Sequence, residues 1–440
     1  MLENKVFGLI SLGCDKNRVD AERLLGIIRE KGYRVTDDIA EANILIVNTC
    51  AFLASAREEA IDTVLECDSY RGKNLEKIVV SGCLPEKFIG ELFPSLTEGD
   101  VFLGCSDADV LLEAIERSYA EGRVNAVGGG HEVEEHRVLT TPLHYAYLKI
   151  ADGCNNFCTY CLIPKIRGKY RSYPIEALVA EASHLGELSE LILVAQDVTR
   201  YGIDLYGEKK LVELIRRLSA LDNIGGIRLL YCYPDVLDDA LIDELAHNDK
   251  LIKYVDIPLQ HSEDRILKLM NRKGSRAEYL ALIRKLRERV PGIAIRSTFI
   301  AGFPTETEEE TEALAEFLRE ASLTNCGFFA YSKEPETAAA RLKGQIPARV
   351  KQRRVKKLYA VQAEISERFL ADKVGKPVEV VCDGIDYASG RFVGRAYWSA
   401  PEIDGKVYFY APQATQGERY TVLADEADAY DLYGHTEDYE

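Results

Sequence analysis

The sequence contains little methionine or tryptophan, no excess of positive charge and no long apolar run. Two Met and one Trp occur among 440 residues, which argues against a Met-rich binding groove. The formal net charge is −17, whereas proteins that bind nucleic acids usually present a basic face. No apolar stretch approaches the roughly 20 residues of a membrane-spanning helix, and no basic segment followed by a long apolar core begins the chain. We therefore expect a cytoplasmic protein that has no membrane partner.

Cysteine, in contrast, is abundant, with eleven residues. In a cytoplasmic chain, a high and odd number of cysteines indicates metal binding or catalysis rather than disulfides. Three of them, Cys154, Cys158 and Cys161, form the run CNNFCTYC. Three thiolates at this spacing can hold three irons of a cubane 4Fe–4S cluster, which normally takes four cysteines. The fourth iron is then open to a substrate, like the open position of a catalytic metal site.

A zinc site is the main alternative interpretation of the same run. Zinc is usually held by a Cys-x-x-Cys pair together with a second Cys pair or with histidines further along. No second pair follows here, because the next cysteine is Cys232 and His184 stands alone. The spacing therefore favours an iron–sulfur cluster over zinc.

Three further cysteines follow apolar runs in the N-terminal part of the chain. The runs VFGLISLGC, ANILIVNTC and KIVVSGC end at Cys14, Cys50 and Cys83. Helical patterns over residues 18–31 and 54–68 separate the runs, and such an alternation predicts buried parallel strands of an α/β domain. Open α/β sheets bind ligands at the carboxyl ends of their strands. We therefore predict that these three thiols form a second cluster site, again with one open iron.

The remaining cysteines share no spacing and are interpreted as packing residues: Cys67, Cys105, Cys232, Cys326 and Cys382. Residues 121–142 interrupt the strand and helix pattern with three consecutive glycines and several acidic residues, which is typical of a connector. His131 and His136 in this segment are interpreted as exposed linker residues rather than ligands.

Six further strand candidates follow the connector: YAYLKI, ELILVAQ, GIRLLYC, KYVDIPL, IAIRSTFIAG and CGFFAYS. Helical patterns separate them, so we predict a partial parallel (βα)6 barrel. The CNNFCTYC run falls after the first strand, at the face where barrel active sites lie. Polar residues near the other strand ends are expected to bind a cofactor there, although each can also be a strand-end residue without a ligand. These candidates are Gln196, Asp197, Gln260, His261, Arg296, Thr298 and Gly302.

The last fifth of the chain begins with a predicted helix over residues 348–371. Six of the nine residues in 349–357 are Lys or Arg, which we interpret as a solvated helix face rather than an RNA contact. Short alternating strands with Gly and Asp turns follow and predict a small antiparallel β-barrel of about five strands. The predicted domains are therefore residues 1–130, 140–371 and 374–440.

Several motifs with a fixed order along the chain carry a family resemblance. They are SLGCDKNRVDAE, NTCAFLASAREEAIDT, GCLPE, YLKIADGCNNFCTYCLIPKIRGKYRS, DIPLQH, MNRKG and FIAGFPTETEEE. In this order they resemble the methylthiotransferases, a branch of the radical S-adenosylmethionine enzymes, and the final segment resembles the TRAM domain. Two positions depart from the family pattern. Tyr173 stands where an S-R-P arginine is common, and Thr305 stands where a G-F-P-G-E glycine is common.

The resemblance implies two 4Fe–4S clusters and S-adenosylmethionine as cofactors. The open iron held by the CNNFCTYC cysteines would chelate S-adenosylmethionine, and an external electron donor would drive its cleavage to a 5′-deoxyadenosyl radical. The three strand-end cysteines would hold the second, auxiliary cluster. In this family one S-adenosylmethionine methylates sulfur held at the auxiliary cluster, and another makes the radical that removes hydrogen from an unactivated carbon.

Within the family, the segments NTCAF, AQDVTRYG and SAPEIDG are most similar to the branch that modifies an aspartate of protein S-twelve of the small ribosomal subunit. The close alternative is the branch that modifies a tRNA adenosine. Residues 374–440 contain five Lys and Arg against thirteen Asp and Glu, a net charge of −8. Such a barrel would repel RNA phosphates and attract a basic ribosomal protein. A non-catalytic iron–sulfur scaffold is a further alternative, which six βα units around an open-iron motif disfavour.

Overall fold

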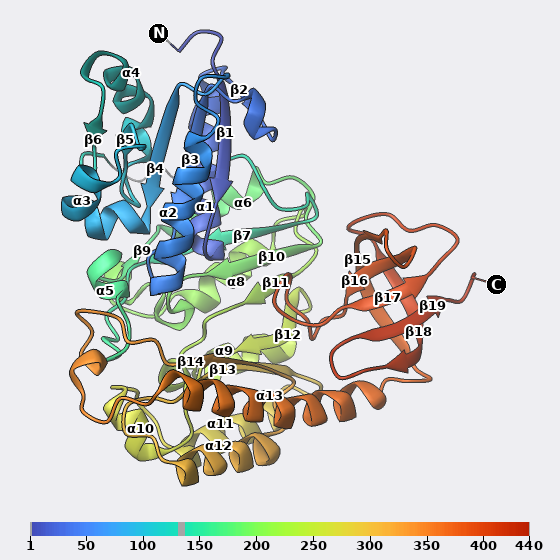
Figure 1. Ribbon diagram of the computed structural model, residues 1–440. Helices are drawn as coiled ribbons and strands as arrows, with labels where there is room; N and C mark the ends of the chain where they lie inside the picture. Colours follow the sequence, from blue (N-terminus) through green and yellow to red (C-terminus); the bar gives the residue numbers. More distant parts are fainter. Residues whose placement is uncertain (1, 131–136, 440) are drawn as a thin grey trace. The chain divides into compact units, whose positions relative to one another are not determined.

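The computed structural model describes residues 2–130 and 137–439 (Figure 1). His131 and His136, interpreted above as linker residues, lie outside the described residues. The chain forms two compact units, and it passes between them inside the CNNFCTYC run. The first unit comprises Met1–Thr141, Tyr147–Asn155 and Cys161–Leu185. The second comprises Pro142–Ala146, Asn156–Tyr160 and Gly186–Glu440.

The first unit contains a six-stranded parallel sheet in the order β2-β1-β3-β4-β5-β6. The three predicted strands are neighbours at its centre: β1 (Val6–Ser11), β3 (Ile44–Thr49) and β4 (Lys77–Gly82). Every residue of β3 is buried, as expected for a central parallel strand. The shorter strands, which the apolar runs did not reveal, are β2 (Arg34–Thr36), β5 (Val101–Phe102) and β6 (Val124–Asn125).

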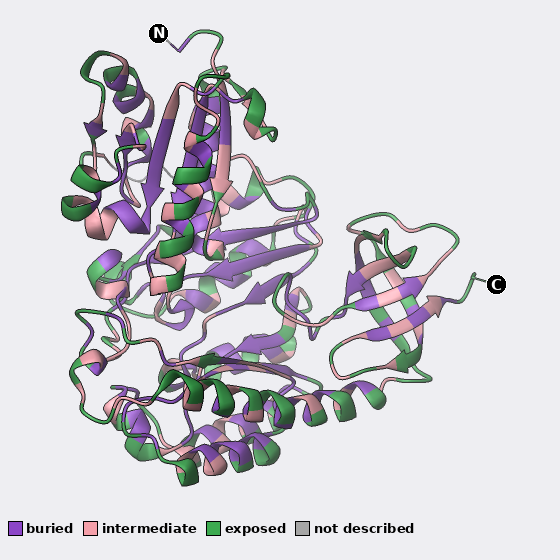
Figure 2. Cartoon of the chain, viewed as in Figure 1, coloured by how far each residue is buried: buried purple, intermediate pink, exposed green. Residues whose placement is uncertain are grey.

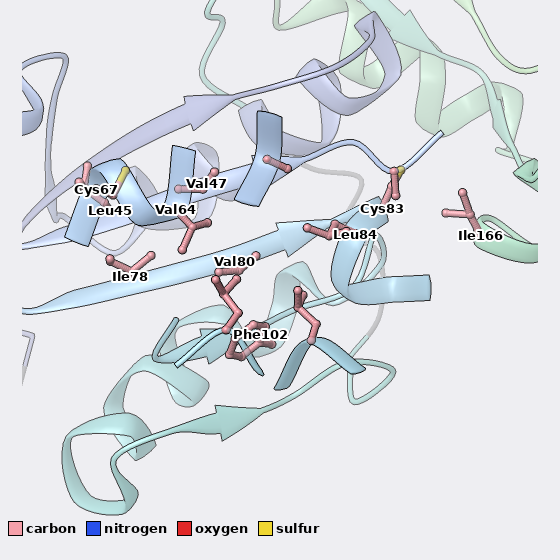
Figure 3. Packing of buried hydrophobic residues seen from close by; sticks show 14 of the residues in the cluster. Leu45, Val47, Val64, Cys67, Ile78, Val80, Cys83, Leu84, Phe102 and Ile166 are labelled. Atoms are coloured by element: carbon pink, nitrogen blue, oxygen red, sulfur yellow. The ribbon is translucent and has the colours of Figure 1, made fainter. Parts of the chain in front are cut away.

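A helix follows each central strand of this sheet. These helices are α1 (Asp15–Glu30), α2 (Ala54–Asp68) and α3 (Cys83–Ser95), and α4 (Leu111–Glu121) comes later. The predicted helix over residues 54–68 is confirmed, whereas α1 begins three residues before its predicted start, with the acidic Asp15 in its first turn. Figure 3 shows the core beside this sheet, where Cys67 packs with Leu45 and Val64 and therefore has the predicted packing role.

The predicted partial barrel is an open six-stranded sheet in the order β14-β13-β12-β11-β10-β7, of which strands β10 to β14 belong to the second unit. Neighbouring strands from β10 to β14 are parallel. The strands are β7 (Tyr145–Lys149), β10 (Glu190–Val194), β11 (Ile227–Leu229), β12 (Leu251–Asp256), β13 (Ala294–Ala301) and β14 (Asn325–Ala330). The main helices between them are α8 (Leu211–Ser219), α9 (Asp239–His247), α11 (Arg276–Arg289) and α12 (Glu308–Ala321).

Buried ion pairs connect the strands of this sheet with the C-terminal segment. The Glu190 carboxylate accepts hydrogen bonds from Arg228 Nε at 2.5 Å and from Arg395 Nη1 at 2.8 Å. Asp404 likewise accepts a hydrogen bond from Arg296 Nε at 3.2 Å. Burial by itself would raise the pKa of Glu190, but the two guanidinium groups lower it to about 2. The carboxylate therefore stays ionised in the interior because both positive charges are held beside it.

The C-terminal segment forms a closed five-stranded barrel in the order β15-β16-β17-β19-β18. Its strands are β15 (Pro377–Asp386), β16 (Arg391–Arg395), β17 (Val407–Tyr410), β18 (Arg419–Ala427) and β19 (Leu432–Thr436). Four neighbouring pairs are antiparallel as predicted, and the β17–β19 pair is parallel. A closed ring of five strands must contain a parallel pair, because strictly alternating directions require an even number of strands.

Helix α13 (Ala348–Ala371) has the predicted bounds. Its basic run is only partly solvated (Figure 2), and for Arg354 the interpretation as a solvated face is wrong. Arg354 is buried, and its Nη1 donates to the Glu306 backbone oxygen at 3.0 Å and to Oε1 at 3.1 Å. In the described part of the chain, no helix has the length and apolar character needed to cross a membrane.

Candidate functional site

The three strand-end cysteines lie at the carboxyl edge of the first unit's sheet, as predicted. Cys14 precedes α1 directly after β1, Cys50 follows β3, and Cys83 opens α3 directly after β4. Because β1, β3 and β4 are adjacent parallel strands, the three residues leave the sheet side by side. The topology thus gathers onto one edge three thiols that are 36 and 33 residues apart in sequence.

Glycines placed before two of these cysteines allow the loops to approach each other closely. Gly13 and Gly82 have φ angles of +95° and +93°, which other residues rarely adopt. A Cβ atom on Gly13 would lie 2.7 Å from the Cβ of Cys50 and 3.3 Å from its Sγ. A Cβ on Gly82 would lie 2.5 Å from Asn48 Oδ1. The Gly-Cys dipeptides therefore keep the space between the cysteine-bearing loops free of side chains.

The sulfur of Cys83 is surrounded by polar groups. Arg167 Nη2 lies 3.3 Å from this sulfur, Asn17 Oδ1 lies 3.5 Å from it, and the Sγ of Cys105 lies 3.8 Å from it. The hydrogen bond from the Cys105 thiol and the charge of Arg167 lower the pKa of Cys83 to about 6, against the effect of burial. Burial instead raises the pKa of Cys50 to about 11. The three thiols therefore differ in how readily they deprotonate to bind a metal.

Arg167 belongs to a buried ionic network that the sequence did not reveal. Its Nη1 donates to Asp20 Oδ2 at 2.7 Å and to Asp152 Oδ2 at 2.9 Å. Lys149 Nζ pairs with the same two carboxylates at 2.5 and 3.3 Å. The side chains of Lys149 and Arg167 are almost fully buried, and all four groups come from motifs that carried the family resemblance. The network connects the Cys83 sulfur with the residues just before the CNNFCTYC run.

The departure at Tyr173 fits the same network. Its buried ring lies 5.6 Å from Lys149 Nζ and 5.4 Å from the guanidinium carbon of Arg23. A ring face attracts cations within about 6 Å. At this position an arginine would add a further positive charge. Tyr173 instead stacks its ring against the two cations already there.

The donor atoms present suit an iron–sulfur cluster better than a single metal ion. Among the described residues, no three His, Cys, Asp or Glu side chains have the arrangement that would hold one metal ion. In a cubane each cysteine binds a different iron, so its ligands need not converge on one point. Three cysteines on adjacent loops, with space kept open by Gly13, match that requirement.

Both ends of the CNNFCTYC run are anchored in the first unit. The backbone nitrogen of Cys154 donates to Gly168 O at 3.2 Å, and Asn155 Oδ1 accepts a hydrogen bond from Tyr170 N at 3.1 Å. At the other end, Cys161 Sγ accepts a hydrogen bond from the Ile163 backbone nitrogen at 3.4 Å. Backbone donors to a sulfur favour its thiolate form.

The middle of the run, Asn156–Tyr160, is held within the second unit by the MNRKG motif. Thr159 N donates to Met270 O at 3.0 Å, and Thr159 Oγ1 donates to Leu269 O at 2.8 Å. Asn271 Nδ2 donates to the backbone oxygens of Asn156 and Phe157 at 3.2 and 3.0 Å. The motif therefore fixes the conformation of the loop that carries Cys158.

Two side chains that sequence reasoning missed lie against Cys158. The Tyr233 hydroxyl lies 2.9 Å from its sulfur, and Arg272 Nη1 lies 3.9 Å from it. The guanidinium carbon of Arg272 is stacked 3.8 Å from the ring centroid of Tyr233. A buried cation here would offset the negative charge of a thiolate-bound cluster. The MNRKG motif contained Arg272, but its spacing gave no sign of this role.

Asp197, predicted to contact the cofactor, is positioned by the same loop. It follows β10 and is buried, and its Oδ2 accepts hydrogen bonds from Asn156 Nδ2 at 3.0 Å and from Arg200 Nε at 2.9 Å. Burial raises the pKa of the Asp197 carboxyl, although these hydrogen bonds oppose it. Gln196 precedes it and is half-buried. Asp197 therefore lies against the cysteine loop.

Two other predicted residues, Gln260 and His261, follow β12, and Gln260 pairs with β13. Gln260 N donates to Thr298 O at 2.8 Å. His261 is fully buried, its Nδ1 accepts a hydrogen bond from Glu263 N, and its Nε2 lies 3.7 Å from Glu306 Oε2. This arrangement places the ring proton on Nε2, directed toward Glu306.

Glu306 also organises the loop that contains Gly302 and Thr305. Its Oε2 accepts hydrogen bonds from Gly302 N at 2.7 Å and from Phe303 N at 3.0 Å. Burial would raise the pKa of Glu306, but the neighbouring His261 ring, the hydrogen bond from the Thr311 hydroxyl and the charge of Arg354 lower it. Thr305 adopts a φ of +70°, which explains why glycine is usual there, and Arg265 holds its Oγ1 and backbone oxygen at 3.0 and 2.8 Å.

Arg296 and Thr298 also lie together, but Arg296 is already paired. Its Nη1 donates to Asp256 Oδ1 at 3.0 Å and to Thr298 Oγ1 at 3.2 Å, and its Nε contacts Asp404. The predicted cofactor candidates thus form one group near Asp197, a second near Gln260 and Gly302, and an ion-paired group around Arg296. Their roles as cofactor ligands remain predictions.

Three family models match successive parts of the chain. Residues 6–104 match the uncharacterized protein family UPF0004, residues 148–318 match the radical SAM superfamily, and residues 374–436 match the TRAM domain. Among solved structures, the chain is similar to TsrM, a radical S-adenosylmethionine methyltransferase from Kitasatospora setae. The TM-score is 0.57 with 16% identity, and the match covers 76% of this chain and 77% of TsrM. At this identity the likeness shows the fold alone.

Curated relatives are much more similar in sequence and match the chain from end to end. The ribosomal protein uS12 methylthiotransferase RimO of Lachnoclostridium phytofermentans is 44% identical, covering 98% of this chain and 100% of the relative. The protein of the same name from Clostridium tetani is 44% identical over 97% of both chains. That of a Thermoanaerobacter species is 41% identical over 98% of this chain. The chain therefore belongs to the RimO family of radical S-adenosylmethionine methylthiotransferases.

Proposed function

We propose that this chain adds a methylthio group to the β-carbon of an aspartate in ribosomal protein uS12, which is protein S-twelve of the small subunit. The observation that carries the proposal is the coexistence of two three-cysteine sets in a chain that matches the RimO relatives over its full length. One set is the CNNFCTYC run, and the other is gathered by three adjacent parallel strands. A reaction that needs a hydrogen-abstracting centre and a sulfur-delivering centre requires two such sites.

Each proposed cluster would be bound by three cysteines of this chain. Cys154, Cys158 and Cys161 would hold a 4Fe–4S cluster that binds S-adenosylmethionine, and the strand-end cysteines would hold the auxiliary 4Fe–4S cluster. When bound, these groups supply one-electron chemistry, a methyl group and the transferred sulfur. An external electron donor and a cytoplasmic setting complete the proposal.

The residues of the second unit would orient and shield the radical cluster. Tyr233 and Arg272 contact the Cys158 sulfur, so they would set the charge and hydrogen bonding around one cluster ligand. Asp197 and Gln260 would contact S-adenosylmethionine, because both lie at strand ends of the partial barrel. Glu306 would hold the Gly302 loop through its two backbone hydrogen bonds.

We further propose that the acidic C-terminal barrel attracts the basic substrate. Asp425, Glu426 and Asp428 are exposed on or beside β18. Asp428 also accepts hydrogen bonds from Tyr430 N, Asp431 N and the Tyr433 hydroxyl, so it stabilises its own turn. Asp425 Oδ2 lies 2.8 Å from His435 Nδ1, a contact that an asparagine oxygen can keep, so Asp425 and Glu426 are the residues to neutralise. Each exposed charge contributes at most about 1 kcal/mol, and the summed field chiefly accelerates encounter.

The docking proposal is tested by measuring the affinity for purified uS12 at several salt concentrations. Asp425→Asn/Glu426→Gln should weaken binding and reduce its salt dependence. The matched control neutralises two exposed acidic residues of α4, Glu113→Gln/Glu116→Gln, and should leave the affinity unchanged. If both variants bind uS12 like the wild type, the acidic barrel does not dock the substrate.

The reaction itself is tested with anaerobically reconstituted protein, S-adenosylmethionine, a chemical reductant and either uS12 or unmodified tRNA. We expect 5′-deoxyadenosine together with uS12 that is heavier by one methylthio group. A methylthio group on tRNA alone would identify the tRNA alternative. Intact clusters without 5′-deoxyadenosine would identify a non-catalytic scaffold.

A further inference from the structure

Cys105, interpreted from the sequence as a packing residue, lies against a predicted cluster ligand. Its Sγ is 3.8 Å from the Sγ of Cys83, within van der Waals contact of sulfur. The two residues come from different strand ends, since Cys83 follows β4 and Cys105 follows β5. Cys105 is partly exposed, whereas Cys83 is buried. The strand-end site therefore contains a fourth thiol beside the predicted three.

The loop that carries Cys105 is held in place by hydrogen bonds. Cys105 N donates to Glu86 Oε2 at 2.9 Å, and Gly104 N donates to Asp107 Oδ2 at 2.6 Å. Asp107 also accepts hydrogen bonds from Gly128 N at 2.8 Å and Gly130 N at 3.0 Å. The contact between the two sulfurs is thus built into the loop and does not depend on a flexible side chain alone.

The short distance between the sulfurs bears on two roles for Cys105, as a fourth cluster ligand or as a disulfide partner of Cys83. As a fourth cluster ligand, it would bind a different iron from Cys83, and the cluster would hold the two sulfurs apart. In the structure they instead touch, and a disulfide requires a separation of about 2 Å. Cys105 also lines a small cavity together with Asn48 and Ser81. In the chain without a cluster, the two sulfurs therefore lie close enough for a small side-chain movement to join them.

We propose that Cys83 and Cys105 form a reversible disulfide when the auxiliary cluster is absent, and that this disulfide withholds Cys83 from cluster assembly. The second half of the inference rests on the proposed function, in which Cys83 is a cluster ligand. The device protects a ligand thiol from irreversible oxidation and makes rebuilding of the auxiliary cluster depend on thiol reductant.

The oxidant is a small-molecule disulfide such as oxidised glutathione. The Cys105 sulfur is the more exposed of the two. Once its proton has passed to solvent, the Cys105 thiolate attacks one glutathione sulfur, forms a mixed disulfide and releases one glutathione thiolate. The Cys83 sulfur, 3.3 Å from the Arg167 guanidinium, then attacks the Cys105 sulfur and releases the second glutathione. Two protein thiols are oxidised and one glutathione disulfide is reduced to two glutathione molecules, which take up the two thiol protons.

The test uses the full-length chain, freed of iron by a chelator and fully reduced, then incubated anaerobically with oxidised glutathione. Remaining thiols are alkylated, and the cross-linked peptides are identified by mass spectrometry. We expect one dominant cross-link, which joins Cys83 to Cys105. Cys83→Ser should instead accumulate a glutathionyl group on Cys105. Cys67→Ser, which removes a thiol from the core of the same sheet, should give the wild-type cross-link.

Iron loading provides the second measurement. Before reduction, the oxidised wild type should load about half the iron of the reduced chain, because only the cluster of the CNNFCTYC run can form. Treatment with dithiothreitol should restore full loading, and Cys105→Ser should load fully after the same oxidation. A cross-link from Cys83 to Cys14 or Cys50, or glutathionylation without a cross-link, would overturn the disulfide.

The two measurements separate this inference from the proposed function. If the Cys83–Cys105 cross-link forms but oxidised and reduced chains load the same iron, the disulfide exists and its control of cluster assembly is wrong. Failure to methylthiolate uS12 would contradict the proposed function and would leave the cross-link result unchanged.

Discussion

The two units of the molecule build their cysteine sites in opposite ways. In the first unit, Cys14, Cys50 and Cys83 come from three loops, and only the order of parallel strands brings them to one edge. The other set lies within eight consecutive residues, whose middle part the MNRKG motif fixes in the second unit. A short spacing encodes a site by itself, whereas a dispersed site exists only once the sheet has formed.

The sites also differ in how charge is arranged around one sulfur. Cys83 lies at the end of a balanced ionic network, in which Arg167 and a lysine face two carboxylates. Cys158 lies instead beside Arg272, whose contacts include a tyrosine ring, a backbone oxygen and the sulfur itself. The charges around Cys83 balance each other without a cluster. The charge of Arg272 beside Cys158 is instead available to offset the negative charge of a bound cluster.

The largest expected effect separates the chemistry of the two sites. Replacing Cys14, Cys50 and Cys83 together by alanine should abolish methylthio transfer but preserve 5′-deoxyadenosine formation, because the other cluster remains. Replacing Cys158 by alanine should abolish both products. Chromatography of the nucleoside and mass spectrometry of uS12 measure the two outcomes. Loss of 5′-deoxyadenosine from the folded strand-end variant would show that the sites do not act separately.

Arg167→Met should strongly destabilise the first unit. It leaves the buried carboxylates of Asp20 and Asp152 with one cation instead of two, and breaking such buried pairs costs about 3–5 kcal/mol. Urea unfolding, followed by circular dichroism, measures the change. The control is Arg171→Ala, which removes an exposed arginine nearby in sequence and should cost under about 0.5 kcal/mol. Equal stability of the two variants would mean that the network does not hold the site together.

The ionic contacts of the second unit should make its stability depend on pH. The pKa of Glu190 is lowered from 4.5 to about 2 in the folded protein, so its contribution is fully present above pH 4.5. It should be lost as the pH falls from 4.5 toward 2, by about 3 kcal/mol in total. Glu190→Gln should make this slope shallower in urea unfolding, because the other carboxyl groups with lowered pKa, such as Glu306, remain. Glu187→Gln, at an exposed position, should keep the wild-type slope. A Glu190→Gln slope as steep as that of the wild type would assign the effect to other carboxyl groups.

Arg272→Met should have the smallest effect on the stability of the cluster-free chain. The substitution removes a buried cation without stranding a carboxylate, so the free energy of unfolding should change by less than about 1 kcal/mol. In the loaded protein the same variant should shift the reduction potential of the radical cluster to more negative values, because a nearby positive charge is lost. Redox titration followed by electron paramagnetic resonance measures the shift. An unchanged potential would show that Arg272 does not act on the cluster.

Much of the fold was predictable because its strands are continuous apolar runs and its helices are periodic. The runs ending at Cys14, Cys50 and Cys83 identified three parallel strands, of which β3 and β4 are buried as predicted, whereas β1 is only partly buried. The position of the three cysteines past the strand ends predicted the edge that they share. The two-residue strands β5 and β6 were missed because such short segments have no hydrophobic pattern. The parallel β17–β19 pair follows from closing five strands, a constraint that no local segment contains.

The surroundings of the cysteines could not be predicted in the same way. Arg167 and Asp20 are 147 residues apart, and Cys105 and Cys83 are 22 residues apart, and neither pair has a recognisable spacing. Family resemblance identified the motifs that contain Arg167 and Arg272 but not what these side chains contact. Such contacts depend on the packing of distant loops, which periodicity and composition do not encode.

The account depends most directly on the presence of two separate clusters. Mössbauer spectroscopy and iron analysis of anaerobically reconstituted, full-length protein count them. The account predicts about eight irons per wild-type chain and about four in each variant that lacks one set of three cysteines. A wild-type chain that holds only about four irons, with no loss when Cys14, Cys50 and Cys83 are replaced by alanine, would contradict it.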